Sequence, residues 1–346
     1  MNSQRQRSIK DNCSLGIIVT TLLVVVAVLS VLALCVGRYQ VAPADTMKIL
    51  ISNVIPIELN STATDYNVIM NLRLPRVIAA ILVGSALSLA GATYQGLFKN
   101  PLVSPDLLGV SSGACVGAAA AILLGFGNVG TQILAFIGGI CAVTLTIAIP
   151  TLMRRSSAIM LVLSGIIVGG FMTSIIGLMK YMADAETELA EIVYWTLGSI
   201  AKVDAANLQV VAPVIIIPGA LLMAFRWRIN ILSLGDNEAR TLGVNVNHER
   251  MLAILCSTLL TASAVCLSGT IGWIGLIIPH LARLLVGSNH MRLLPATALM
   301  GAAFLLVIDT LARTLTGGEL PLGILTGFIG APFFTWVLIR QRMSTE

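Results

Sequence analysis

The segment from residue 230 to residue 250 is a polar island in a mostly apolar sequence: six ionisable side chains lie close together in it, and uncharged stretches of about twenty residues lie on either side. Ser233 can cap the start of a helix, Asp236 follows like the acidic partner of a capping box, and Gly243 suits a helix end. The pattern predicts a helix of about two turns whose surface fits a groove on a soluble partner. An ordinary solvated loop is the alternative. The ionisable residues are Asp236, Glu238, Arg240, His248, Glu249 and Arg250.

The sequence lacks the motifs of the common catalytic and cofactor sites. It contains no G-x-x-x-x-G-K-[ST] loop for ATP phosphates and no H-E-x-x-H zinc motif. Its six cysteines form no C-x-x-C or cysteine–histidine ligand spacing. We therefore expect no metal and no cofactor in this chain, no catalytic residues and no enzymatic activity of its own. If the protein uses ATP, a separate subunit must hydrolyse it.

The composition is that of an integral membrane protein. Of 346 residues, 57% are hydrophobic and only 11% are charged, against roughly 25% charged residues in soluble domains. The net charge of +5 comes from bases that flank apolar runs, so it does not indicate nucleic-acid binding. The first apolar run, 15–37, is too long for a signal-peptide core and predicts a retained span.

The pattern predicts one transmembrane domain over residues 1–346. Two regions between the spans stand out: a long loop over 39–71 and a short helix around 186–199. Gly269, Gly272 and nearby breakers predict a discontinuous helix where the seventh span meets the eighth. A helical span needs about 20 apolar residues, and ten candidate ranges follow: 15–37, 77–98, 107–126, 130–153, 157–179, 207–225, 251–270, 271–287, 293–312 and 320–339.

Basic residues predict the orientation of these spans. With ten spans and a cytoplasmic N-terminus, fourteen of the 21 lysines and arginines fall inside and seven fall outside. This excess follows the positive-inside rule. We therefore expect both termini, and the segment 230–250, to be cytoplasmic.

Two blocks of sequence resemble the iron-chelate (siderophore), heme and cobalamin uptake permeases, the transmembrane subunits of type II ABC importers. The resemblance runs in register over roughly residues 70–340. The polar segment matches the family's cytoplasmic stretch ending Ala239-Arg240-Thr241-Leu242-Gly243. The first block is Leu72-Arg73-Leu74-Pro75-Arg76, Gln95-Gly96-Leu97-Phe98, Asn100-Pro101-Leu102 and Pro105-Asp106-Leu107-Leu108-Gly109; the second includes Ile278-Pro279-His280, Ala312-Arg313, Glu319-Leu320-Pro321-Leu322-Gly323 and Gly330-Ala331-Pro332-Phe333.

This resemblance implies an all-α polytopic membrane protein of about ten transmembrane helices. It also implies an inverted repeat that relates spans two to five to spans seven to ten. The partners it implies are a second permease subunit (homodimer or close heterodimer), two cytoplasmic ABC ATPase subunits, an extracytoplasmic substrate-binding protein and the lipid bilayer. In the family the short polar helix sits in a cleft of the ATPase. The coupling residues predicted on that basis are Leu232, Gly235, Asp236, Ala239, Arg240, Leu242 and Gly243.

Three arginines on the external side oppose the basic bias. Arg73 and Arg76 are three residues apart and so share one helix face, with Pro75 in the first turn. Arg313 ends the ninth span. By resemblance these arginines attract acidic residues of the binding protein. The alternatives are lipid phosphates or internal pairing, such as Arg313 with Asp309.

The cytoplasmic gate is assigned only by resemblance. Asn100 and Leu102 of one bend, with Ser156 and Ser157 of another, would meet their symmetry mates at the cytoplasmic end of the path; simple turns are the alternative. His280 suggests either a proton relay or a cap on broken backbone.

Taken together, the sequence predicts the permease subunit of an ABC importer in a bacterial cytoplasmic (inner) membrane, with a ferric siderophore as the favoured cargo. The main alternative is a secondary transporter driven by an ion gradient without an ATPase. Such proteins usually hold acidic residues near the midplane, and Asp309 is the only acid inside a candidate span. Heme, cobalamin and molybdate remain open as cargo.

Overall fold

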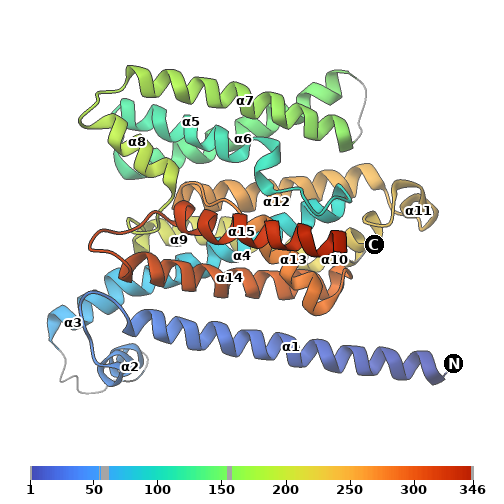
Figure 1. Cartoon of the computed structure of the whole chain (residues 1–346), viewed down its shortest axis with the longest axis horizontal. Coiled ribbons are helices and arrows are strands. Elements are labelled where there is room, and N and C mark those ends of the chain that lie inside the picture. Colours follow the sequence, from blue (N-terminus) through green and yellow to red (C-terminus); the bar gives the residue numbers. More distant parts are fainter. Residues whose placement is uncertain (1, 54, 56–61, 154–157, 344–346) are drawn as a thin grey trace.

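The computed structural model describes residues 2–53, 55, 62–153 and 158–343. Every regular element in these ranges is a helix, and the long helices run side by side in one bundle (Figure 1). The chain is therefore all-α, as the sequence predicts. The helices are α1 (Asn2–Cys35), α2 (Pro43–Ser52), α3 (Ala63–Asn67), η1 (Val68–Arg73), α4 (Leu74–Leu97), η2 (Pro105–Leu108), α5 (Val110–Leu123), α6 (Gly127–Leu152), α7 (Ala158–Met182), α8 (Glu188–Leu197), α9 (Ala205–Ala224), α10 (Arg226–Leu232), α11 (Asp236–Thr241), α12 (Val246–Ser268), α13 (Ile274–Val286), α14 (His290–Thr314) and α15 (Leu322–Met343).

A helix occupies each of the ten ranges proposed as spans. Seven of the described helical stretches are long and apolar enough to cross a membrane, and three more are shorter apolar helices. The short ones are Val110–Leu123, Ile274–Val286 and Leu322–Val337. That these ten helices cross the membrane stays a prediction.

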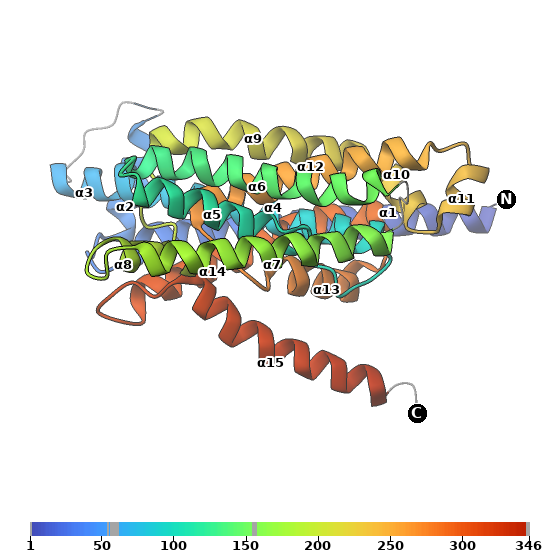
Figure 2. The same ribbon diagram turned by 90° about the horizontal axis from the view of Figure 1, so that it is seen from above.

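The two ends of the bundle differ in what they carry. We call the end that bears α2, α3 and α8 the α8 end, and the opposite end, where α1 begins and α15 finishes, the α11 end (Figures 1 and 2). Most of α15 diverges from the bundle (Figure 2). The start of α1 and the end of α15 therefore lie at the same end of the bundle as the segment 230–250.

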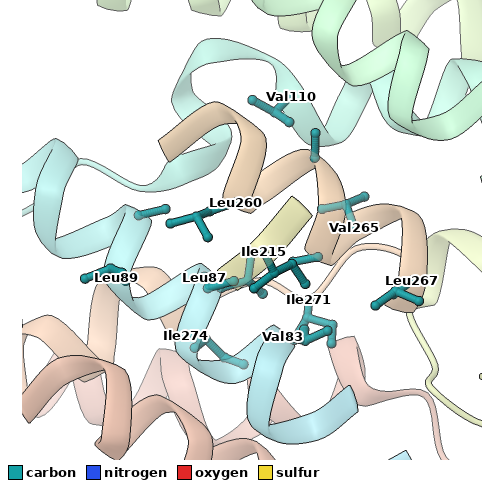
Figure 3. Close-up of a cluster of buried hydrophobic side chains, with 14 of the residues drawn as sticks. Val83, Leu87, Leu89, Val110, Ile215, Leu260, Val265, Leu267, Ile271 and Ile274 are labelled. Carbon is teal, nitrogen blue, oxygen red and sulfur yellow. The ribbon is translucent and has the colours of Figure 1, made fainter. Parts of the chain in front are cut away.

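The centre of the bundle is formed by α4 and α12, the most buried of the seven long apolar stretches. These are the first helices of the two sets that the family's inverted repeat pairs. Glycine lets α4 approach α14 closely, because a Cβ on Gly84 would strike the carbonyl oxygen of Gly301. The core side chains shown in Figure 3 come mainly from α4 and α12, with contributions from their neighbours: Val83, Leu87, Leu89, Val110, Ile215, Leu260, Val265, Leu267, Ile271 and Ile274.

The predicted helix break is confirmed between α12 and α13. Ser268 ends α12, Gly269 takes a left-handed φ of +65°, and α13 begins only at Ile274. The exposed backbone groups find partners on neighbouring segments: Ser199 N–H donates to the Ser268 carbonyl at 2.7 Å. Non-helical backbone inside a bundle persists when protein groups satisfy it in this way.

Two local predictions were wrong. The region 39–71 is not one long loop, because it contains α2, α3 and η1. The last two run directly into α4, so one helical stretch covers 63–97. Pro75 lacks an N–H, and the turn before it is a π-helix that the chain passes through without breaking.

Ser233 does not start the short polar helix. It stands at the C-terminal end of α10, where its hydroxyl donates to the Asn230 carbonyl at 2.7 Å. The residue before α11 is Gly235, whose φ of +150° places it in a backbone region that favours glycine. The predicted helix is real but begins at Asp236, since α10 already uses the serine. The predicted helix near 186–199 is confirmed as α8.

Candidate functional site

The segment at the α11 end combines buried anchors with exposed apolar side chains. Ala239 is fully buried and Leu232 is 2% exposed, so both fasten the segment to the bundle. Leu234 and Leu242 are 59% and 58% exposed, and the Arg240 side chain also faces outward. A short helix with an inner apolar contact, flanked by two outward leucines, is suited to contact a second protein.

Polar contacts hold this segment in place. Arg250 Nη2 of α12 lies 2.5 Å from Asp236 Oδ1, which ties the first turn of α11 to α12. Gly243 ends the helix as predicted, with a φ of +76°, and the next residue's N–H donates to the Ala239 carbonyl at 3.0 Å. Asn245 then caps α12 by accepting from the His248 N–H at 3.2 Å. The segment therefore contains a short helix that hydrogen bonds and an ion pair join to the bundle.

One predicted gate bend contacts the same segment. Lys99 Nζ, at the end of α4, donates to the Leu234 carbonyl at 3.3 Å. The adjoining bend is closed by Asn100, whose Oδ1 accepts from the Leu102 N–H at 2.9 Å. Leu102 itself is 53% exposed. Ser156 and Ser157 lie outside the described residues.

A buried cluster of charges joins four parts of the chain at the α8 end. Arg76 Nε of α4 lies 2.8 Å from Asp309 Oδ1 of α14, and its Nη1 lies 2.9 Å from Glu319 Oε1 in the loop before α15. Arg313 Nε lies 3.3 Å from Asp309 Oδ2 and its Nη2 donates to the Ala33 carbonyl of α1 at 3.0 Å. The cluster joins α1, α4, α14 and the Glu319 loop.

Arg73 completes this end from η1. Its Nη1 donates to the Leu34 carbonyl at 2.6 Å and to the Cys35 carbonyl at 3.1 Å, so it closes the last turn of α1. Arg73, Arg76 and Arg313 are only 5%, 8% and 7% exposed. The three arginines predicted to meet the binding protein therefore all have partners within this chain. For Arg313 the geometry is that of the alternative, pairing with Asp309. Their docking role stays a prediction.

Sequence reasoning gave no role to two residues of these sites, Glu319 and Lys99. Arg76 and Glu319 are 243 positions apart, so no spacing rule connects them. A charge in an otherwise apolar turn, such as the Glu319-Leu320-Pro321 sequence, is the one available signal. Likewise, Arg283 Nη2 donates to the Gln95 side chain, so this arginine ties α13 to α4.

The turns outside the spans at the α8 end are stabilised by carboxylates. Asp184 accepts from the Thr187 hydroxyl at 2.8 Å, and this hydrogen bond holds the pKa of Asp184 below its usual range. Asp65 forms a capping box with Thr62 at the start of α3. Both carboxylates therefore stabilise local backbone structure.

Comparisons with known proteins agree with this arrangement. A solved structure described as an inward-facing conformation of a metal-chelate type ABC transporter matches with a TM-score of 0.85 and 36% identity, covering 94% of this chain and 99% of that one. The "Molybdate import system permease protein MolB" of Haemophilus influenzae is 39% identical over 93% of this chain and 94% of its own length. A "Probable iron chelatin transport system permease protein" of Helicobacter pylori is 44% identical over 80% of this chain and 83% of its own length.

The fold, the projecting α11 segment and these likenesses define a permease subunit of a type II ABC importer for metal chelates. It is a multi-pass membrane protein, and ATP hydrolysis in such importers resides in a separate subunit. The profile of the FecCD transport family matches residues 22–340, and the chain belongs to that family.

Proposed function

We propose that this chain carries a ferric siderophore across a bacterial inner membrane, as one half of a permease dimer driven by two ABC ATPase subunits. Residues 1–346 form one transmembrane domain of ten spans with both termini cytoplasmic. The observation that carries the proposal is the α11 segment, which is anchored by Ala239 and Arg250 yet presents Leu234 and Leu242 outward. A substrate path alone would not need such a surface.

The coupling surface consists of the seven residues predicted from the sequence. Leu232 and Ala239 are its buried base, Gly235 and Gly243 set its ends, and Asp236 fixes its angle. Arg240 and Leu242 make the contact with the ATPase. The Lys99–Leu234 hydrogen bond would carry a displacement of this segment to the gate bend at Asn100 and Leu102. Ser156 and Ser157 complete the gate in this proposal.

The second permease subunit packs against α7. This helix exposes large apolar side chains, among them Phe171 at 62%. Along the same helix, a Cβ added at Gly169, Gly170 or Gly177 would meet no atom within 4 Å. Small residues beside large ones let helices approach closely in lipid. An identical second copy fits this surface, and we propose a homodimer.

The binding protein docks at the α8 end. There Arg73, Arg76 and Arg313 outnumber Asp309 and Glu319, so the cluster keeps a net positive charge although it is internally paired. A cleft of about 310 Å³ opens over it and is lined in part by these arginines. The positive electrostatic potential of this cluster steers the acidic lobes of a binding protein toward the outer end of the substrate path.

A ferric siderophore is the proposed cargo, supported by the relative named for iron chelatin, which is 44% identical over 80% of this chain. The relative named for molybdate, 39% identical over 93% of this chain, makes molybdate the main competing cargo. An ion-gradient transporter is disfavoured by Asp309. This acid of α14 already lies between Arg76 and Arg313, so it is not available to bind and release a coupling ion.

The first test is extraction of the tagged chain from its native membrane in mild detergent, followed by native mass spectrometry. Two ATPase copies on a permease dimer support the proposal, and replacing Asp236–Gly243 with a flexible linker should remove them. Uptake of ⁵⁵Fe-siderophore, hemin, cobalamin and molybdate into proteoliposomes that contain the complex and the binding protein then identifies the cargo. Accumulation without any ATPase under a proton or sodium gradient would overturn the proposal.

A further inference from the structure

Two adjoining hollows lie at the α8 end, beside α6 and α9. One is a small polar hollow of about 40 Å³ lined in part by Glu191, Trp195 and Lys202. The other is an apolar groove of about 410 Å³ between α6 and α9. Gln132 and Cys266 line both hollows, so the polar one leads into the apolar one. The shape is that of a site for a molecule with a polar head and an apolar tail.

The apolar groove opens on the outside of the bundle, the side that faces lipid in the proposed topology. Ile133 and Ile137 of α6 and Val210 of α9 line it and are 54%, 48% and 73% exposed. Its floor is α12. All three helices are long and apolar enough to cross a membrane. Because the groove lies between candidate spans and is bounded mainly by hydrocarbon, a hydrocarbon chain matches it chemically.

Two buried polar groups at this groove have no partner among the residues that the structure describes. They are Asn207 Nδ2 and Ser263 Oγ, and their side chains belong to residues that are 8% and 0% exposed. A buried donor is unfavourable without an acceptor, and hydrocarbon supplies none. Asn207 lies in the first turn of α9, at the α8 end, where the head region of a lipid would lie. An ester or phosphate oxygen would satisfy it.

The polar hollow carries both signs of charge. Lys202 Nζ lies 3.3 Å from Glu191 Oε1, and both side chains are more than half exposed. Tyr194 and Trp195 line the same hollow, and these residue types prefer the membrane–water interface. A head that contains both a phosphate and a primary ammonium group matches this pair, with the phosphate toward Lys202 and the ammonium N–H groups toward Glu191; the quaternary ammonium of choline has no N–H to donate.

We propose that the two hollows form one binding site for a phospholipid with an ethanolamine head. Its head lies on Lys202 and Glu191, an oxygen of its glycerol or phosphate region accepts from Asn207, and one acyl chain fills the groove along Ile133 and Val210. Ser199, which lies just after α8 and lines the polar hollow, also donates its backbone N–H to the carbonyl of Ser268 at the end of α12. The lipid would therefore brace the segment that seals the break between α12 and α13.

The test uses the complete transporter, delipidated in detergent and returned to nanodiscs of phosphatidylcholine doped with either palmitoyl-oleoyl phosphatidylethanolamine or the matching phosphatidylglycerol. Native mass spectrometry counts the retained lipid as the dopant is titrated. Val210→Trp places a bulky ring in the groove, and Ile216→Trp is the matched control, because Ile216 is 56% exposed on the same helix but does not line the groove. Lys202→Gln tests the head site without changing the groove.

We expect phosphatidylethanolamine to be retained at one copy per subunit. Val210→Trp and Lys202→Gln should each weaken retention about tenfold, and Ile216→Trp should leave it unchanged. Lys202→Gln keeps the test decisive if the tryptophan in the groove prevents folding. Equal retention of phosphatidylglycerol, equal retention by all variants, or no retained lipid would each overturn the proposal. None of these results depends on ATPase coupling or cargo.

Discussion

The two ends of the bundle differ in which side chains they bury and which they expose. At the α8 end, Arg76 and Asp309 are 8% and 1% exposed and paired with each other. At the α11 end, the outward side chains of Leu234 and Leu242 are more than half exposed on a segment that is otherwise firmly anchored. A charge that has found its partner inside the chain holds the chain together. An apolar side chain that an anchored segment presents on the outside of the bundle is placed to contact another protein.

The largest expected effect comes from removing the central carboxylate of the α8-end cluster. Asp309→Ala leaves Arg76 and Arg313 buried, close to each other and without their shared partner. Breaking a buried ion pair from one side costs about 3–5 kcal/mol. We expect a marked loss of folded protein and of thermal stability in detergent, measured by fluorescence size-exclusion thermal shift.

Asp45→Ala is the matched control for this cluster. Its pair with Lys48 spans 3.8 Å and both side chains are at least 40% exposed. Exposed pairs contribute at most about 1 kcal/mol, so this variant should stay close to wild type. If both variants behaved alike, the buried pairing at the α8 end would contribute no more to stability than a surface pair, and the contrast between the two ends would fail.

The second effect concerns the exposed apolar side of the α11 segment. Leu242→Asp places a charge where we propose that the ATPase packs. Loss of a central apolar contact costs about 2–4 kcal/mol of binding free energy, roughly 30-fold or more in Kd. Titration of labelled permease in nanodiscs with purified ATPase measures it, while the thermal stability of the permease alone should not change, because Leu242 is 58% exposed.

Asn237→Asp adds the same charge to the same segment without removing an apolar contact, since Asn237 is exposed and polar. It should leave the ATPase affinity within a few-fold of wild type. An equal loss in both variants would mean that the charge of the segment, and not the leucine, sets the association.

The third effect concerns the contact between α4 and α14. It tests whether the ion pairs or the close backbone packing at glycine set the distance between the two helices. Gly84 and Gly301 each lie eight residues from a member of the cluster, Arg76 and Asp309 respectively. A Cβ in Gly84→Ala would strike the Gly301 carbonyl oxygen and force the helices apart. Overpacking of this kind costs about 1–3 kcal/mol, to be measured by the same thermal-shift assay.

Gly16→Ala is its control, because no atom lies within 4 Å of a Cβ at that position of α1. Adding an exposed alanine to a helix should be neutral or slightly stabilising. A neutral Gly84→Ala would show that α4 and α14 have slack and that the ion pairs alone define their spacing.

These contrasts bear on what could be predicted from sequence. Helix positions followed from apolar runs, because the bilayer imposes one length scale on every span. The break near Gly269 followed from glycine chemistry. Local capping was harder to predict. Ser233 has the side chain of an N-cap residue, but α10 extends to Leu232, so Ser233 is the C-cap of that helix and does not start α11.

Pairing between distant residues was the part that sequence could not supply. Arg76 and Glu319 meet only because α4 and α14 lie side by side, and no spacing rule links them. The pair of Arg313 with Asp309 was foreseen as an alternative because it lies within one helical turn. From the sequence alone, the external arginines therefore suggest docking of a binding protein. With their neighbours in the structure known, they suggest that the arginines hold α1, α4 and α14 together.

The smallest expected effect tests how the α11 segment is held at its angle. Asp236→Asn weakens the 2.5 Å contact with Arg250, whose side chain is 13% exposed against 46% for the aspartate. Half-exposed pairs contribute about 0.5–1 kcal/mol, so the ATPase Kd should rise two- to fivefold, without a change in permease folding. Raising the salt concentration should reduce the difference in ATPase Kd between the variant and the wild type, because screening weakens the intact pair.

Glu238→Gln removes the same charge from the same helix but leaves Arg250 paired, so it should bind the ATPase more tightly than Asp236→Asn. Equal affinities would assign the effect to the net charge of the helix and leave its angle to the buried Ala239 alone.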